Sequence, residues 1–186
     1  MTWDELQTVD VGRLFSAEFS GTTVPTLEEA LEFARGRLKL NIEIKYMGAS
    51  SDLPEKVAAC IEAKGWTEQC VVTSTSYSYL KRVKEAAPDI YTGYIVSAAY
   101  GKYYRDDTID FISTLSSSVS RKLIEEAHDS GKEVHVWTVN RRSELERMKL
   151  LGADNVITDD PLMAREVLYG EENTEHLLTR IREMLR

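Results

Sequence analysis

The sequence predicts an α/β fold built on a parallel sheet, and two observations lead to this class. Short apolar runs alternate with segments of helical periodicity from residue 38 onward. Such alternation implies right-handed crossovers between parallel strands. Several of the runs are apolar on both faces, which is typical of sheets that helices cover. Periodicity alone leaves open whether the sheet is doubly wound or curls into a barrel.

About six strands are expected, each a short run rich in apolar and β-branched residues. The run LKLNIEIKY is the first, and EVHVWTV has the strongest strand pattern. A Gly-rich phosphate loop of the GxGxxG or GxxxxGK type is missing from the sequence, which argues against nucleotide binding. The expected strands are Leu38–Tyr46, Gln69–Thr73, Ile90–Val96, Asp110–Ser113, Glu133–Val139 and Asn155–Thr158.

Helices are expected before the first strand and after most of the others, because capping and stop signals lie there. The last 16 residues, Glu171 to Arg186, are predicted to form a charged amphipathic helix. The expected N-caps are Thr26, Asp52, Ser120, Asn140 and Asp160, and the expected ends are Gly65, Pro88, Gly131 and Gly152.

Charge and composition exclude several classes of function. The net charge is −8, from 23 Lys and Arg against 31 Asp and Glu, and cations are scattered among acids, so no nucleic-acid partner is expected. There is no apolar run of membrane-spanning length and no secretory signal pattern. The two cysteines, Cys60 and Cys70, are expected to be buried thiols in a reducing compartment, which favours the cytoplasm.

The strongest candidate for chemistry is the pair Glu43 and Lys45. A spacing of two residues places both side chains on one face of the first expected strand. A charged pair inside a buried strand is costly unless it is paired or bound to a metal. Two interpretations remain equally open: a carboxylate metal ligand beside a cation for an anionic substrate, or an internal salt bridge lining a barrel.

Other polar residues are assigned structural roles. His135 shares a strand face with Trp137 and is expected to be a satisfied core histidine, because a lone histidine is seldom a catalyst. His128 lies in the last turn of a helix, where a cation suits the helix dipole. Ser74 and Ser76 are expected to cap the next helix, and Asp159 to hold the rim of the sheet.

Four segments, in order, resemble the glycerophosphodiester phosphodiesterase family. They are VPTLEEAL (24–31), LNIEIK (40–45), VWTVN (136–140) and GADNVITDDP (152–161). The resemblance implies a (β/α)₈ barrel, a divalent cation such as calcium or magnesium, and hydrolysis of glycerophosphodiesters to an alcohol and glycerol 3-phosphate. It implies that Glu43 is a metal ligand, that Lys45 contacts the phosphate and that Trp137 lines the substrate pocket.

The chain departs from this family at its start. Members begin with a His-Arg-Gly strand, a Glu-x-Asp strand and a His-Asp pair, which supply the catalytic histidines and further metal carboxylates. None of these precedes Asp4, and Ser74-Thr75 replaces a common Ser-Phe. The resemblance therefore implies an incomplete barrel that lacks its first two strands, with residues 1–170 as a truncated phosphodiesterase domain and residues 171–186 as a helix.

Three interpretations follow from this departure. In the favoured one, the chain is an inactive piece of a phosphodiesterase without catalytic residues of its own, and the parent protein could be attached to a membrane. In the second, an upstream polypeptide completes the site. In the third, the chain is a non-catalytic binding or interaction module. Because a barrel that lacks strands exposes sheet edges, a homodimer or a strand-swapped oligomer is expected.

Overall fold

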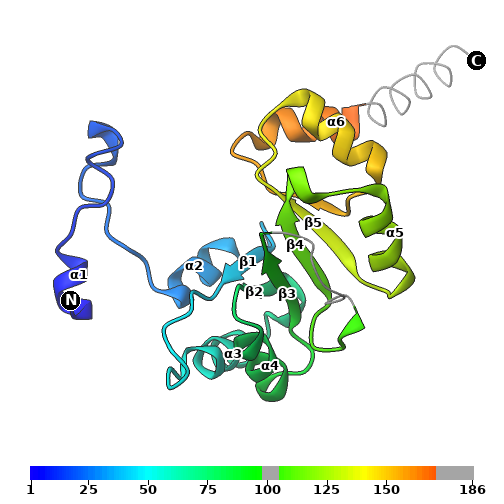
Figure 1. Ribbon diagram of the computed structural model, residues 1–186. Coiled ribbons are helices and arrows are strands. Elements are labelled where there is room, and N and C mark those ends of the chain that lie inside the picture. Colours follow the sequence, from blue (N-terminus) through cyan, green and yellow to red (C-terminus); the bar gives the residue numbers. More distant parts are fainter. Residues whose placement is uncertain (98–104, 171–186) are drawn as a thin grey trace, which may run out of the picture. The chain divides into compact units, whose positions relative to one another are not determined.

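The structure is a computed structural model, and it describes residues 1–97 and 105–170 (Figure 1). The chain divides into two compact units, Met1–Leu40 and Asn41–Arg186. The expected C-terminal helix, residues 171–186, lies outside the described residues. No helix among the described residues has the length and apolar character needed to cross a membrane.

The first unit contains short helices joined by a loop. Thr26 and Glu29 form the expected capping box, in which the Thr26 hydroxyl accepts from the Glu29 backbone N–H and the Glu29 carboxylate accepts from the Thr26 N–H. The Asp10 carboxylate accepts hydrogen bonds from the backbone N–H groups of Gly21 and Arg13, among others, and these bonds lower its pKa. The elements are α1 (Trp3–Gln7), η1 (Ala17–Phe19) and α2 (Leu27–Ala34).

In the described part of the chain, six strands form one sheet in the order β1-β2-β3-β4-β5-β6, and the neighbouring strands from β2 to β6 are all parallel. Apart from Leu40, the sheet belongs to the second unit. The strands are β1 (Leu40–Glu43), β2 (Cys70–Ser74), β3 (Tyr91–Val96), β4 (Phe111–Leu115), β5 (Glu133–Trp137) and β6 (Asn155–Val156). The six predicted strands are therefore confirmed.

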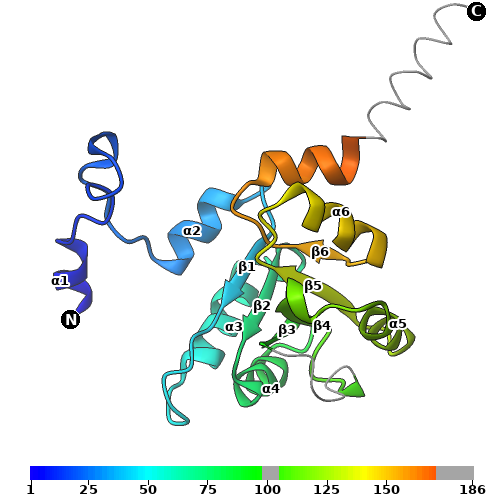
Figure 2. The ribbon, with the colours of Figure 1, turned by 45° about the horizontal axis from the view of Figure 1, so that its top comes forward.

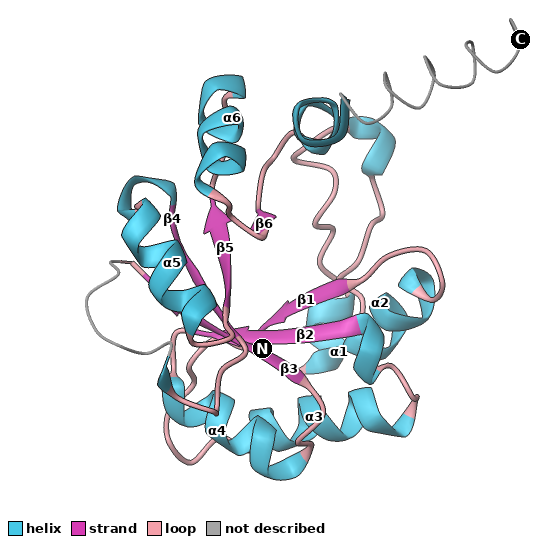
Figure 3. Ribbon diagram, turned by 90° about the vertical axis from the view of Figure 1, so that its right-hand side faces the viewer, coloured by secondary structure: helices cyan, strands magenta, loops and turns pink. Residues whose placement is uncertain are grey.

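Helices follow most strands and lie on one side of the curled sheet (Figures 2 and 3). Residues 161–170 are also helical. The other helices of this unit are α3 (Leu53–Ala63), α4 (Tyr77–Ala86), α5 (Arg121–Asp129) and α6 (Arg142–Leu151), and the short 3₁₀ turns are η2 (Thr67–Gln69) and η4 (Ser116–Ser118).

The hydrophobic core lies between the sheet and these helices. Strand residues Ile112, Val134 and Val136 are buried there together with Ile124 of α5 and Met148 of α6. Every second residue of each strand points to this side. The remaining residues of the same strands therefore face the opposite side, which we call the concave face.

Register identifies the residues of the concave face. Phe111 of β4 pairs with Glu133 of β5, and Ser113 pairs with His135. Because paired residues of parallel strands point to the same side, these four side chains and Trp137, two residues beyond His135, share one face. The sheet is thus an open half-barrel whose interior wall is this concave face.

Several predicted helix ends are confirmed. The Ser120 hydroxyl accepts from the Leu123 N–H at 3.2 Å, and the Asp160 carboxylate accepts from the Met163 N–H at 3.0 Å, as N-caps do. Gly152 ends α6 with φ = 89°, a left-handed conformation that suits glycine.

One predicted N-cap is at the wrong residue, and another is at the right residue but lacks its side-chain bond. The N-cap of α6 is Arg141, without a side-chain cap bond, because the Asn140 side chain bonds to Asp159 instead. At α3 the Asp52 side chain makes no cap bond, because it pairs with Lys56 at 2.9 Å. In both cases a competing partner takes the side-chain oxygen.

Candidate functional site

Glu43 and Lys45 lie at the carboxyl end of β1, where parallel α/β sheets carry their functional groups. The strand ends at Glu43, and the two side chains form an ion pair. The expectation of a pair inside a buried strand is wrong, since the side chains are 37% exposed for Glu43 and 77% for Lys45. Lys45 follows the strand, and its ammonium group is open to an incoming anion.

The Glu43 side chain belongs to the concave face. Asn41, two residues earlier, accepts a hydrogen bond from the Thr73 hydroxyl through Oδ1, at 2.8 Å. Thr73 pairs in register with Gly93, and Gly93 pairs with Phe111 on the concave face. By the alternation of side chains along a strand, Glu43 points to the same side as Asn41. Ile44 is buried on the other side.

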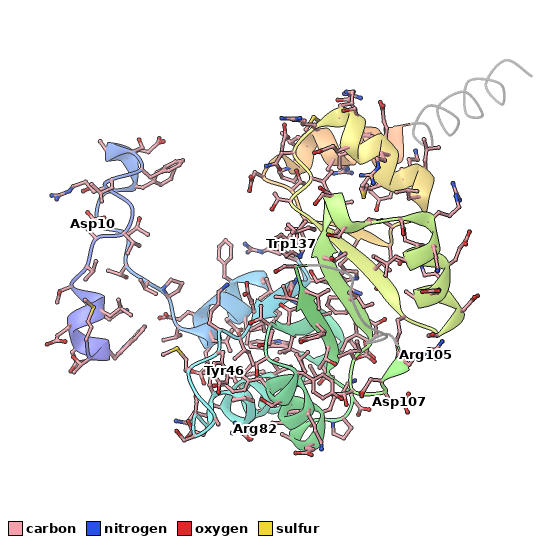
Figure 4. All side chains as sticks on the ribbon, viewed as in Figure 1. Asp10, Tyr46, Arg82, Arg105, Asp107 and Trp137 are labelled. Carbon is pink, nitrogen blue, oxygen red and sulfur yellow. The ribbon has the colours of Figure 1, made fainter. Side chains whose placement is uncertain are left out.

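Trp137 ends β5 at the same carboxyl edge (Figure 4). Its indole Nε1 is buried, and it has no hydrogen-bond acceptor among the residues that the structure describes. A buried N–H without an acceptor costs about 1–3 kcal/mol. Such a donor beside a functional edge is what a bound oxygen atom could satisfy. The indole is thus both a wall of the concave face and a candidate donor.

His135 is a core residue, as predicted. Its side chain is 7% exposed, its ring stacks on Phe111 with centroids 3.9 Å apart, and Nε2 lies 2.9 Å from the Glu133 carboxylate. Burial lowers the pKa of His135, and the nearby Glu133 opposes that shift. Because Glu133 begins β5 and Trp137 ends it, His135 lies below the carboxyl edge, away from Lys45.

Aromatic rings close the amino-terminal part of the concave face. Tyr91 stacks on Phe111 with centroids 5.7 Å apart, which extends the stack that His135 begins. Burial, and next the negative charge of Glu133, raise the pKa of Tyr91 to about 12. Tyr91 therefore stays protonated at neutral pH, and this end of the face is a packed floor.

The loop after β1 is fixed by Arg82 of α4 (Figure 4). The guanidinium binds both carboxylate oxygens of Glu55 at 2.6 Å and donates to the Ser51 carbonyl at 2.7 Å. Such two-pronged pairs are geometrically specific. The pKa of Glu55 is lowered, chiefly by the hydrogen bond from Arg82. Sequence reasoning missed Arg82, because no local pattern links residue 82 to a loop some thirty positions earlier.

Ser74 and Ser76 do not play the predicted capping role. The Ser74 hydroxyl donates to the Ile44 carbonyl at 2.8 Å and accepts from the Ser76 N–H at 3.0 Å. It thereby ties the ends of β1 and β2 together. Ser76 is the N-cap residue of α4 but makes no side-chain cap bond. Its hydroxyl lies 3.0 Å from that of Ser78.

Asn140 and Asp159 form a clamp across the ends of β5 and β6. The Asn140 amide donates to Asp159 at 2.6 Å, and its oxygen accepts from the Asp159 N–H at 2.9 Å. The prediction that Asp159 holds the rim is confirmed. Cys60 and Cys70 are not joined in a disulfide, as predicted. Cys70 is buried, and burial raises the pKa of its thiol, whereas Cys60 is only half-buried, so the prediction of a buried thiol is wrong at Cys60.

The donors present do not make a divalent-metal site by themselves. No group of three or more His, Cys, Asp or Glu side chains within residues 1–97 and 105–170 is arranged to hold a metal ion. Calcium and magnesium take about six or more oxygen ligands, several of them commonly carboxylates. Glu43 supplies one carboxylate, which Lys45 already engages.

Comparison with known protein families shows which family this half-barrel belongs to. Residues 1–163 match the model of the glycerophosphoryl diester phosphodiesterase family. The chain belongs to this family. The match includes Glu43, Lys45 and Trp137.

Several similar proteins are named as phosphodiesterases. A glycerophosphodiester phosphodiesterase of Caldanaerobacter subterraneus subsp. tengcongensis is 28% identical over 170 residues, covering 86% of this chain and 68% of that protein. Another, from Arabidopsis thaliana, is 25% identical and covers 88% of this chain and 52% of its own length. The chain thus spans between half and about two thirds of these relatives.

Solved structures confirm the fold. A phosphodiesterase of Oleispira antarctica, solved in complex with the product sn-glycerol-3-phosphate, superposes with a TM-score of 0.77 at 24% identity. The similarity covers 90% of this chain and 70% of that one. A glycerophosphodiester phosphodiesterase of Agrobacterium tumefaciens gives a TM-score of 0.74 at 24% identity, over 88% and 71% of the two chains.

Proposed function

We propose that the chain supplies one wall of a glycerophosphodiester-binding site and is inactive alone. Lys45 places a positive charge where a phosphate can approach, Trp137 offers a wall and an unsatisfied N–H, and Glu43 contributes one carboxylate. The observation that carries the proposal is the exposed Glu43–Lys45 pair at the carboxyl edge of β1, inside the segment that matches the family. An ammonium group beside a phosphate stabilises negative charge without a proton transfer.

In this proposal Glu43 is a single ligand of a divalent-metal site that needs further carboxylates. Residues 1–170 act as a partial phosphodiesterase domain. No acid–base histidine is assigned, because His135 is stacked and bonded to Glu133 below the edge. Without a positioned acid or base, a hydrolytic step loses typically 10²–10⁴-fold in rate.

Activity is tested with glycerophosphocholine in the presence of calcium or magnesium. We expect hydrolysis by the chain to be no faster than hydrolysis by a Glu43→Ala variant. Metal-dependent turnover that this substitution abolishes would contradict the proposed inactivity. Loss of glycerol 3-phosphate binding in a Lys45→Ala variant, by calorimetry, would support the binding wall independently of turnover.

A non-catalytic binding module is the second candidate, favoured by the lack of a metal-holding cluster in the described ranges. The two candidates differ in what an added polypeptide does. If a fragment that carries the family's His-Arg-Gly and Glu-x-Asp strands restores metal-dependent hydrolysis, the chain is part of an enzyme. If that fragment binds without restoring hydrolysis, the chain is a binding module.

Self-association follows from the open sheet. Among the strands that the structure describes, β1 and β6 each have a neighbour on one side only. Unpaired strand edges are templates for further pairing. We therefore expect a homodimer or a strand-swapped oligomer, and size-exclusion chromatography with light scattering measures the mass. A monomer at all concentrations would contradict this expectation.

A further inference from the structure

A depression of about 400 Å³ is lined by the segments that follow β1 and β2. Its volume is within the range of roughly 300–1,000 Å³ that small-molecule sites occupy. All the residues that line it carry a hydroxyl group, and none carries a charge. They are Tyr46, Thr75, Ser76, Tyr77 and Ser78.

The depression adjoins the Glu43–Lys45 edge through the chain itself. Tyr46 directly follows Lys45. Thr75 follows β2 and comes two residues after Thr73, whose hydroxyl bonds to Asn41 on the concave face. The depression and the Glu43–Lys45 pair therefore lie in the same segments, at the carboxyl ends of β1 and β2.

The hydroxyl groups of the lining are only partly engaged. Tyr77 donates to the Thr108 hydroxyl at 3.0 Å and also bonds to the Asp106 carboxylate, and the Ser76 and Ser78 hydroxyls share one bond. Neither the Tyr46 nor the Thr75 hydroxyl bonds to another residue in the described part of the chain, and both residues are exposed. A hydroxyl both donates and accepts, so the depression offers alternating donors and acceptors.

Its aromatic rings are already in contact with other rings. Tyr46 packs on Tyr79 with centroids 5.2 Å apart, and Tyr77 meets Tyr94 edge to face at 6.0 Å. A quaternary ammonium group is held by several free ring faces or by a carboxylate, and the lining provides no carboxylate. The chemistry therefore suits a neutral polyhydroxyl group better than a cation.

We propose that this hydroxyl-lined depression is the subsite for the leaving alcohol and that it takes a polyol head group, such as inositol or glycerol, in preference to choline. The inference rests on the proposed function, because the phosphate position is defined by Lys45. Thr75 and Tyr46 are the residues whose free hydroxyls select the polyol.

The test is an NMR titration of the full ¹⁵N-labelled chain with three probes: myo-inositol, choline and glycerol 3-phosphate. We expect myo-inositol to shift the amide signals of residues 75–78 and choline to leave them in place. A Thr75→Val variant, which keeps the shape and removes the hydroxyl, should weaken myo-inositol binding about three- to tenfold, the loss of one hydrogen bond. Thr67→Val is the matched control, because Thr67 precedes β2 at its opposite end.

The outcomes separate the two proposals. Signals that respond equally to choline, or an equal loss in Thr67→Val and Thr75→Val, would overturn the polyol subsite. A response of Lys45 to glycerol 3-phosphate without any response of residues 75–78 to myo-inositol would overturn the subsite and leave the proposed function standing. A response to myo-inositol without any response to glycerol 3-phosphate would overturn the proposed function and support a polyol pocket that is independent of it.

Discussion

The Phe111 ring stacks on the His135 imidazole with centroids 3.9 Å apart and planes inclined by 24°. His135 is thereby buried between an aromatic ring and the Glu133 carboxylate, 2.9 Å from Nε2. The contact joins neighbouring strands β4 and β5 on the concave face. The stacked rings fill the concave face of the half-barrel on the amino-terminal side of the edge that carries Lys45.

The stability of the fold is expected to decrease as the pH falls below about 6.5, the value for an unperturbed histidine. Burial lowers the pKa of His135 in the folded chain, so below that pH the unfolded chain binds more protons. The contribution of neutral His135 is present above the unfolded pKa and is lost as the pH falls toward the folded pKa. Urea unfolding between pH 8 and pH 5 measures it.

A His135→Gln variant is the control for that titration, because glutamine keeps a hydrogen-bonding amide and does not ionise in this range. Its free energy of unfolding should vary less between pH 8 and pH 5 than that of the natural chain. An identical pH dependence in the two proteins would show that other groups cause the decrease.

Gly93 should not tolerate a side chain. An added Cβ would lie 2.1 Å from the Phe111 ring, so Gly93→Ala must displace the ring that holds His135. Overpacking of this kind costs about 1–3 kcal/mol, read from chemical denaturation. Gly170→Ala is the matched control, since nothing lies within 4 Å of its added Cβ. Equal stability of the two variants would contradict the stacked floor.

Ser120 and Asp52 should differ although both precede helices. Ser120→Ala removes the bond to the Leu123 N–H and should lower the free energy of unfolding by about 1 kcal/mol. Asp52→Ala should have no measurable effect, because Asp52 makes no cap bond and only pairs with Lys56 in solvent. Thermal unfolding compares the stability of the two variants. A larger loss of stability in Asp52→Ala than in Ser120→Ala would refute the assignment of the caps.

Arg82→Lys should loosen the loop between β1 and α3. A lysine cannot reproduce the bonds to both Glu55 oxygens and to the Ser51 carbonyl at once. Limited proteolysis should then cut within residues 44–52 faster than in the natural chain. Lys81→Ala is the control, because Lys81 pairs with Glu85 of its own helix, at 3.8 Å, and with no other acid within residues 1–97 and 105–170. Equal cleavage of the two variants would argue against the clamp.

Much of the fold was predictable because strand and helix signals are local. The apolar runs located the six strands, and Ser120, Asp160 and Gly152 marked helix ends, since a cap depends on only a few neighbouring residues. The caps at Asn140 and Asp52 were mispredicted because their partners, Asp159 and Lys56, competed for the same oxygen atoms. One-residue signals do not reveal such competition.

The sequence predicted which residues form the candidate site, but it did not predict how exposed those residues are. The two-residue spacing placed Glu43 and Lys45 on one face, yet their exposure depends on the sheet remaining open, which no local pattern encodes. The hydroxyl-lined depression was not anticipated. It arises where the segment after β1 meets the segment after β2, some thirty residues apart, and serine and threonine there resemble ordinary caps.

The central claim is that Lys45 and Trp137 belong to one phosphate-binding wall. The most direct measurement follows the indole N–H signal of Trp137, assigned by its loss in Trp137→Phe, while glycerol 3-phosphate is added to the labelled chain. The account predicts a saturable shift of this signal in the natural chain and none in Lys45→Ala. A Trp137 signal that stays fixed, or that shifts equally in Lys45→Ala, would contradict it.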